Sequence, residues 1–368
     1  MERNNDQISS VQLGMILSVT IIGVGILTLP RVLTEAVGPD GWIVLLIGGF
    51  MTLVIGILMA KLVKKFPQKS IEQISSSLIG KFLGKIISIG FCIYLIILAA
   101  IETRICGEIV KAYLLLHTPI EILMITLLFT ASYLARSGIE PIARMAQIIF
   151  PMVIVIAIGM ILPVIPEIDL SNFLPVFKTP LVKILKAIPI GFFSFIGIEL
   201  ILIFSQFVID KKNIKKHACL TVGMVLAIYM CILIVTVGRF GIIETTHTIW
   251  PSLEIFKTVD LPGAFIENIE IFIIAIWIFS VFMTLAGAYF GASLLLSGAL
   301  GSKEQNYFVL PILPLIYYLA LIPDNIAQAG DYMDKFSNYL VPVYVILLPI
   351  LFLIISVLKK SKGGKTGA

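Results

Sequence analysis

The sequence predicts an all-α integral membrane protein with ten transmembrane helices, arranged as a 5+5 inverted repeat in which helices 1 and 6 are broken. Three observations predict this fold. Apolar residues make up 59% of the 368 residues and charged residues 13%, against roughly 45–50% and ~25% in soluble domains. Apolar runs of about 20 residues, the length that crosses a bilayer, recur along the chain. Two of these runs contain glycines and a proline, which weaken a helix where lipid offers no other hydrogen-bond partners.

The apolar runs divide into two sets of five. The first half contains predicted spans at 11–36, 42–63, 82–101, 120–135 and 142–164. The second half contains predicted spans at 184–209, 218–238, 264–298, 306–322 and 338–358. The connections between them are too short and too apolar for a soluble domain. We therefore expect one membrane domain at 11–358, between an N-terminal tail at 1–10 and a basic C-terminal tail at 359–368.

The positions of lysine and arginine predict the orientation. With the N-terminus inside the cell, most of the 27 basic residues fall in cytoplasmic segments, as the positive-inside rule requires. Both tails are then cytoplasmic. The first ten residues, MERNNDQISS, are polar, and no cleavage pattern of small residues follows the first apolar run, so we expect this helix to be retained. The net charge of +5 matches the anionic inner leaflet and does not indicate nucleic-acid binding.

The sequence contains no constellation typical of an enzyme. Its four cysteines lack CxxC spacing, and its three histidines lie far apart near predicted helix ends. The carboxyl-terminal GGKT lacks both the earlier glycine and the preceding strand of a phosphate loop. We therefore expect a protein that is not an enzyme and that uses no metal or cofactor.

The first apolar run contains the stretch GVGILTLP, from Gly23 to Pro30. In a helix interior glycine costs about 1 kcal/mol and proline about 3 kcal/mol relative to alanine. Within the bilayer no water compensates for a lost backbone hydrogen bond. We therefore expect the helix to be interrupted here, with other groups of the protein satisfying the backbone.

The sixth apolar run contains a second interruption, PIGFFSFIGIEL, which extends from Pro189 to Leu200. It includes Gly191, Gly197 and the acidic Glu199. The two interruptions fall in helices 1 and 6, the first helix of each five-helix half. Interrupted helices at corresponding places in two halves are typical of inverted-repeat membrane proteins with a ligand site near the midplane.

The two interruptions offer complementary groups to a ligand. The half-helix that begins near Ile26 directs a positive dipole end at the gap, which suits a carboxylate. Carbonyl groups freed between Ser194 and Gly197 suit an ammonium group, so the predicted ligand is a small zwitterion. Gly23, Gly25 and Gly197 leave space for that ligand at the backbone. Close helix packing is the alternative explanation of these glycines.

The motifs GVGILTLPR and GFFSFIGIEL resemble those of the amino acid, polyamine and organocation permease superfamily. The chain length, the ten predicted helices and the wording GILTLPR more narrowly resemble the B subunits of spore germinant receptors, over essentially the whole chain. The resemblance implies a subunit of the spore inner membrane that senses a nutrient, commonly an amino acid. It also implies a partly soluble A subunit and a lipoprotein C subunit as partners. By position, the implied ligand-facing backbone comprises Gly23, Val24 and Gly25 in helix 1, and Ser194, Phe195, Ile196 and Gly197 in helix 6.

Three further polar residues within the spans are candidates for the site. Glu199 lies at a depth where an acid is costly, and it is expected to bind a proton, anchor helix 6 or touch the ligand. Ser280 and Thr284 are one turn apart on helix 8. They are expected to face the helix 1 carbonyls, as in a sodium site, or the ligand, unless they bond back to their own helix.

Helix 3 contributes Tyr94 and Leu98, whose i, i+4 spacing places them on one face where they can wall the pocket. Thr28, within GVGILTLP, completes the set of candidate ligand-binding residues. Just beyond the predicted end of helix 3, Glu102, Arg104 and Glu108 are expected to serve an outer vestibule or a subunit contact, and the last two are spaced to form an ion pair.

Three functions fit this sequence. The first is a receptor subunit in which ligand binding shifts a two-state membrane element. The second is an amino acid permease, and the third is a channel or scaffold subunit with an empty pocket. Helix 5, at 145–164, has no lysine, so the lysine-based proton coupling of some permeases is absent. Sodium or another proton carrier stays open, and the fold alone does not choose among the three.

Overall fold

The computed structural model describes residues 6–23, 25–257, 269–302 and 304–363. Within these ranges the regular structure is helical, apart from an isolated β-bridge between Ile8 and Val208. The helices are α1 (Ser10–Ile22), α2 (Gly25–Val37), α3 (Gly41–Lys65), α4 (Ile71–Ile79), α5 (Lys81–Tyr113), α6 (Ile120–Arg136), α7 (Ile139–Val164), α8 (Leu181–Phe193), α9 (Leu200–Phe204), α10 (Ile214–His247), α11 (Pro251–Lys257), α12 (Ile269–Leu300), α13 (Asn306–Leu321), α14 (Ile326–Val341) and α15 (Leu348–Gly363).

Six helical segments in the described part of the chain are long and apolar enough to cross a membrane. They are Gly25–Lys65, Lys81–Tyr113, Ile139–Glu167, Lys211–His247, Ile271–Leu300 and Ile326–Lys359. Ser10–Ile22 and Asn306–Leu321 are shorter apolar helices. Helices also occupy each of the ten predicted ranges, although residues 264–268 of the eighth lie outside the described residues. The chain is therefore an all-helical, multi-pass membrane protein.

Both predicted helix interruptions are present. The first apolar run divides into α1, which ends at Ile22, and α2, which begins at Gly25; Gly23 has the non-helical angles φ −29° and ψ −123°. Val24 lies outside the described residues. In the sixth run, α8 ends at Phe193 and α9 begins at Leu200. Gly197 between them has φ +115°, a conformation that glycine adopts without a Cβ clash.

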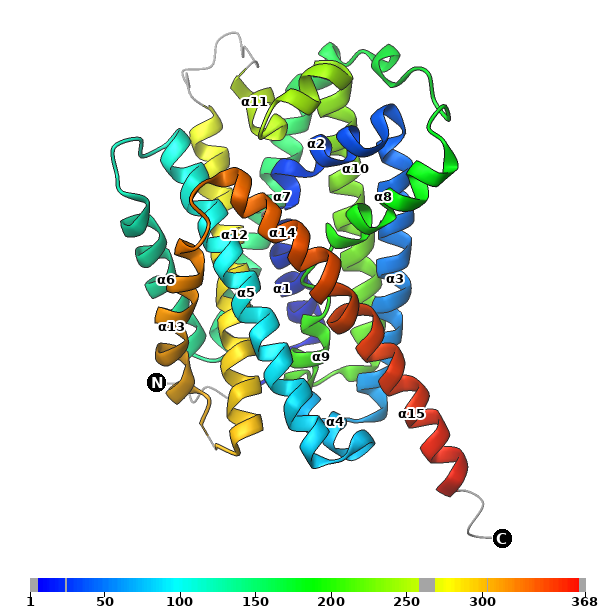
Figure 1. Cartoon of the computed structure of the whole chain (residues 1–368), viewed down its shortest axis with the longest axis vertical. Coiled ribbons are helices and arrows are strands. Elements are labelled where there is room, and N and C mark those ends of the chain that lie inside the picture. Colours follow the sequence, from blue (N-terminus) through cyan, green and yellow to red (C-terminus); the bar gives the residue numbers. More distant parts are fainter. Residues whose placement is uncertain (1–5, 24, 258–268, 303, 364–368) are drawn as a thin grey trace.

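The broken first helix lies inside the bundle. Helix α1 contacts α7, α10, α12 and α9, and Figure 1 shows it at the centre with α9 below it. Helices α3 and α8 pack closely through glycines. A Cβ on Gly48 of α3 would lie 2.2 Å from the backbone of Gly191 in α8, so a larger residue does not fit there. The two interruptions are thus held in the interior by helices on all sides.

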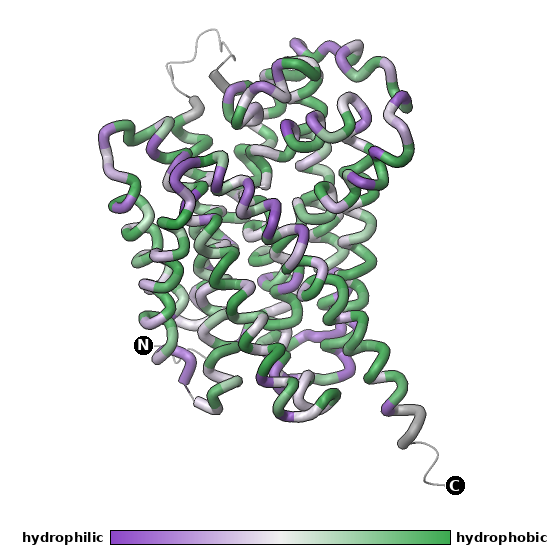
Figure 2. Tube along the Cα trace, in the orientation of Figure 1, coloured by the Kyte–Doolittle hydropathy of each residue, from purple (hydrophilic) through white to green (hydrophobic). Residues whose placement is uncertain are grey.

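The N-terminal segment lies at the same end of the bundle as the loop after α9. The Ile8 amide donates to Phe207 O at 3.0 Å, and the Ile209 amide donates to Ile8 O at 3.0 Å. Figure 2 shows polar residues concentrated near the two ends of the bundle and apolar residues between them, with α14 as a polar exception.

Several helical segments extend beyond what apolar runs predict. Helix α5 continues to Tyr113 rather than ending near 101, and α14 begins at Ile326 rather than near 338. Helix α4, within a predicted loop, begins with a capping box in which Ser70 and Gln73 bond reciprocally. The criterion of apolar length misses such segments because they are amphipathic or charged. Residues 359–363 of the predicted C-terminal tail continue α15, whereas 1–5 and 364–368 lie outside the described residues.

Candidate ligand site at the two helix breaks

The two helix breaks lie next to each other. The Tyr229 hydroxyl of α10 lies 2.7 Å from Ile21 O at the end of α1 and 3.2 Å from Ser194 O at the end of α8. A Cβ on Gly197 would lie 3.0 Å from Cγ2 of Thr20, so the second break packs directly on α1. Tyr229 is fully buried. Tyr229 is not among the residues predicted from the sequence, because a tyrosine in a long apolar run has no signature of its own.

Side chains of α12 satisfy the backbone at the first break. The Thr284 hydroxyl lies 3.0 Å from Thr20 O and 3.1 Å from Ser280 O, and the indole N–H of Trp277 donates to Gly23 O at 2.8 Å. Two of the predicted alternatives for Thr284 are therefore present together. Its hydroxyl faces a carbonyl of helix 1 and also bonds back to its own helix. The Ser280 hydroxyl is buried and has no hydrogen-bond partner in the described part of the chain.

A buried carboxylate holds the second break. Glu199 Oε2 accepts a 2.8 Å hydrogen bond from the Gly197 amide, and Oε1 accepts a 2.9 Å bond from the Tyr94 hydroxyl of α5. The Glu199 side chain is 0% exposed. A buried carboxylate is tolerated only where hydrogen bonds replace its hydration. This geometry anchors the broken helix to α5.

Fewer carbonyl groups of the second break are free than the glycines and proline in the sequence predict. The Phe195 carbonyl accepts from the Ile198 amide, the Gly197 carbonyl accepts from the Leu200 amide, and Ser194 O accepts from Tyr229. The expectation of freed carbonyls is thus wrong for three of the four residues from Ser194 to Gly197. The reason is local, since the chain continues in tight i→i−3 turns instead of unwinding fully.

A second carboxylate faces the first break. Glu102 of α5 is 5% exposed, and its Oε2 would lie 3.8 Å from a Cβ on Gly23. The expectation that Glu102 serves an outer vestibule or subunit contact is wrong, because α5 continues for three more turns beyond this residue. The apolar run of α5 ends at its first charged residues, but the helix continues past them to Tyr113.

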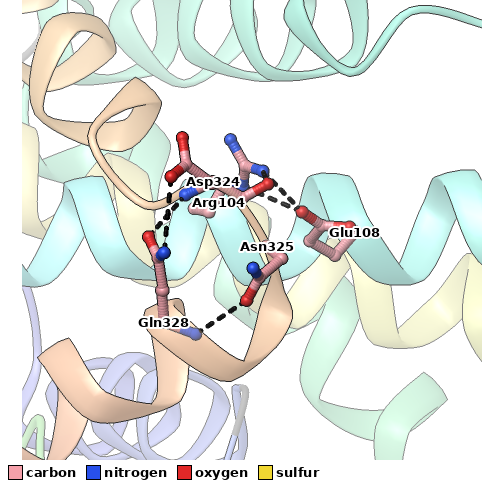
Figure 3. Close-up of polar contacts among 5 residues, drawn as sticks. All are labelled: Arg104, Glu108, Asp324, Asn325 and Gln328. Atoms are coloured by element: carbon pink, nitrogen blue, oxygen red, sulfur yellow. Dashed lines mark hydrogen bonds and ion pairs between the residues drawn. The ribbon is translucent and has the colours of Figure 1, made fainter.

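Arg104 ties α5 to the turn that precedes α14. Its Nη2 atom lies 2.6 Å from Glu108 Oε1 and 2.8 Å from Asp324 O, and the ion pair with Glu108 is the one that the spacing predicts. Figure 3 shows Gln328 bonded to both Asp324 and Asn325 in the same turn. Arg104 is 6% exposed, so this contact is an internal brace of the fold.

The other predicted site residues surround these contacts or lie beside them. Leu98 and Phe195 are buried, with the Phe195 ring centroid 5.6 Å from that of Tyr229. The residues that are partly exposed are Gly25, Thr28, Ser194 and Ile196. An apolar cavity borders the first break, and of the predicted site residues it includes only Ser280.

Comparisons with known proteins agree with the resemblance in the motifs. The profile of a family described as "Spore germination protein" matches residues 7–329. Spore germination protein YndE of Bacillus subtilis (strain 168) is 31% identical over 358 residues, covering 96% of this chain and 97% of the relative. Spore germination protein A2 of the same organism is 31% identical, covering 93% of each chain.

A relative from another species aligns over an even larger share of the chain. Spore germination protein GerLB of Bacillus cereus is 26% identical and covers 99% of this chain and 98% of the relative. The predicted resemblance to spore germination proteins is therefore confirmed. Because the family profile and these relatives match nearly the whole chain, this protein belongs to the spore germination protein family.

Proposed function

We propose that this chain is the B-type membrane subunit of a nutrient-germinant receptor and that it binds a small amino acid between its two helix breaks. The observation that carries the proposal is the Tyr229 hydroxyl, which lies within hydrogen-bond distance of Ile21 O and Ser194 O. This residue makes the two breaks a single buried unit. A ligand that contacts either break then affects both.

The N-terminus of α2 is the proposed site for the ligand carboxylate. The first four amides of a helix have no partner within it, and the helix dipole favours an anion there. Helix α2 begins at Gly25, where a Cβ would lie 3.5 Å from the Tyr229 hydroxyl and 3.7 Å from Ser194 O. The glycine therefore keeps the space between the two breaks open.

Glu102 is the proposed partner of the ligand ammonium group. Its buried carboxylate faces Gly23 from α5, and it supplies a negative charge beside the first break. A hydrogen bond between an ammonium group and a carboxylate is roughly twice as strong as one between neutral groups. Together, the α2 amides and Glu102 recognise the two ends of a zwitterion.

The proposed topology has ten membrane crossings in two inverted halves. It counts the α1–α2 and α8–α9 pairs as one broken crossing each and places both termini in the cytoplasm of the spore. The positive-inside bias of the basic residues supports that orientation. As a receptor subunit the chain assembles with A and C subunits, and the ligand acts by binding one conformation of the broken helices more tightly than the other.

An amino acid permease is the second candidate. The fully buried Glu199, held by an exchangeable tyrosine proton, is the observation that favours it, because such intramembrane acids often carry protons in transporters. Uptake of labelled amino acids into vesicles that contain the purified chain separates the two functions. Uptake against a gradient supports the permease, and saturable binding without uptake supports the receptor.

Equilibrium binding of the standard amino acids to the purified full-length protein tests the proposal. For each amino acid that binds, we expect its amide and its N-acetyl derivative to lose most of the affinity. Glu102→Gln should cause a similar loss, while Glu121→Gln, an exposed acid on α6, serves as the matched control. Exclusive binding of a sugar or a purine would overturn the zwitterion site.

A further inference from the structure

A cavity borders the first helix break on the side of α7. Its walls come from α1, α2, α7, α10, α11 and α12, and include Ile22, Ile26, Ala157, Thr236, Trp277 and Ser280. Ile26 and Leu27, in the first turn of α2 that is proposed to hold the ligand carboxylate, line this cavity, whereas Gly25 and Glu102 do not. The cavity therefore shares the first turn of α2 with the proposed zwitterion site but does not include Glu102, the proposed partner of the ammonium group.

The chemistry of the cavity wall excludes a charged ligand. Among the described residues that line it, most are aliphatic and none is charged. Ions are not taken from water into such a site without a compensating charge. The occupant that the wall favours therefore has an apolar body and is neutral.

Two buried hydroxyls are available to the occupant. Thr236 and Ser280 are 0% and 1% exposed, and neither hydroxyl has a hydrogen-bond partner in the described part of the chain. Buried hydroxyls in helices usually donate to the carbonyl one turn earlier, as Ser18, Thr52 and Thr103 do here. An unsatisfied buried hydroxyl costs about 1–3 kcal/mol. Thr20, Thr34 and Ser88 are also buried without a hydroxyl partner in the described part of the chain, but of these five residues only Thr236 and Ser280 line the cavity.

The size of the cavity limits the occupant to a few heavy atoms. Its volume is about 50 Å³. By the same measure, one water molecule needs roughly 10–15 Å³. That is space for roughly four water-sized groups. A four-carbon alcohol has this size and the required chemistry, because its chain fills the apolar part and its hydroxyl pairs with Thr236 or Ser280.

Helix α7 lies between the cavity and the outer surface of the bundle. Val155 and Ile158 on this face are 67% and 52% exposed, whereas Ala157 in the cavity wall is 6% exposed. In a membrane protein, exposed aliphatic side chains of a spanning helix face lipid. Small alcohols partition into lipid, so they are concentrated on the lipid-facing side of the helix that forms this wall.

We infer that this cavity is a second binding site, specific for a small neutral amphiphile with an aliphatic body and one hydroxyl group. Residues that hold the first break form its wall. Trp277 donates to Gly23 O at 2.8 Å, and Ser252 donates to Ile26 O at 3.1 Å. An occupant therefore stabilises the arrangement of the break in which the cavity exists, which makes the cavity a modulatory site.

Photolabelling with 3-azibutan-1-ol, a butanol that carries a diazirine, tests this inference on the full-length protein in membranes. We expect mass spectrometry to place the label on residues of α7, α10 or α12 that line the cavity, and excess 1-butanol to displace it. Excess butane-1-sulfonate, which has the same chain but a charged head, should not displace it.

Variants of the wall give the second part of the test. Ala157→Phe fills the cavity and should abolish the labelling, whereas Ile158→Phe, one residue away on the exposed face, should leave it unchanged. Thr236→Val and Ser280→Ala each remove a hydrogen-bond partner and should weaken displacement by 1-butanol about fivefold. Labelling that is confined to other surfaces, that survives Ala157→Phe, or that butane-1-sulfonate displaces equally would overturn the inference. Normal abundance of Ala157→Phe, measured in parallel, shows that the loss is not a loss of protein.

Discussion

The Tyr94 hydroxyl donates a 2.9 Å hydrogen bond to Glu199 Oε1, across 105 residues of sequence. Both side chains are 0% exposed. The other carboxylate oxygen accepts from the Gly197 amide, the only glycine of the second break with positive φ. One carboxylate therefore fixes both the local conformation of the break and its position on α5.

Tyr94→Phe should destabilise the protein by about 1–3 kcal/mol, because it leaves one oxygen of a buried carboxylate without a partner. We expect a lower Tm for the purified protein in detergent. Tyr133→Phe is the matched control, since Tyr133 is 78% exposed and its hydroxyl has no buried partner to lose. An unchanged Tm for Tyr94→Phe would show that the buried hydrogen bond contributes nothing.

Glu199→Leu should reduce the amount of protein in the membrane more than Glu199→Gln does. Leucine leaves both the Gly197 amide and the Tyr94 hydroxyl without an acceptor, while glutamine keeps one acceptor oxygen. Immunoblots of membranes from strains that express each variant measure the difference. Equal, normal amounts of both variants would contradict an anchoring role for this residue.

Gly25→Leu should abolish ligand binding and leave protein abundance near normal. The nearest atom to a Cβ at Gly25 is 3.5 Å away, an ordinary contact, so the backbone tolerates a side chain here and the isobutyl group occupies the proposed ligand position between the breaks. Gly48→Leu is the contrasting variant, because its Cβ would lie 2.2 Å from the backbone of α8 and should prevent folding. Loss of abundance with Gly25→Leu would favour the packing explanation, and unchanged binding would refute the site.

Cysteine labelling tests the proposed topology. In a background without the four native cysteines, an impermeant maleimide added outside intact cells should modify Asp331→Cys and leave Asn213→Cys unmodified. The positive-inside bias places residue 213 in a cytoplasmic basic loop. Permeabilised cells, in which both positions should react, provide the control. The reverse pattern in intact cells would invert the topology.

Asp210→Asn should loosen the N-terminal end of α1. The Ser10 amide donates to Asp210 Oδ1 at 2.6 Å, and the Ser10 hydroxyl donates to Oδ2 at 2.5 Å. Burial raises the pKa of Asp210, but these hydrogen bonds outweigh it and hold the pKa below the ordinary value of 3.8. The stabilisation is therefore fully present above pH 3.8 and is lost as the pH falls through the lowered value of the folded state.

The difference in Tm between the parent protein and Asp210→Asn should follow that dependence. It should be constant near neutral pH and shrink on strong acidification. Asp331→Asn, an exposed acid in α14, is the control. A difference that grows as the pH falls would contradict the assignment of Asp210 as the ionised acceptor.

The sequence alone determined the membrane class, the helical ranges and the two interruptions. The length of an apolar run is a local property of the sequence. Within a bilayer, few structures other than helices satisfy the backbone hydrogen bonds of such a run. Glycine and proline also act locally, so Gly23 and Gly197 mark the breaks without knowledge of the fold. The ends of α5 and α14 were missed because they carry charged and polar residues, and such residues end an apolar run without ending the helix.

Only the tertiary structure decided which groups satisfy the broken backbone. Tyr229, Trp277 and Glu102 reach the breaks from helices distant in sequence, and no spacing rule relates them to Gly23 or Ser194. The structure also showed that tight turns engage the carbonyls expected to be free. Hydrogen bonds across a helical bundle depend on how the helices pack, and packing is set by side-chain shape over the whole molecule, which a motif in one helix does not contain.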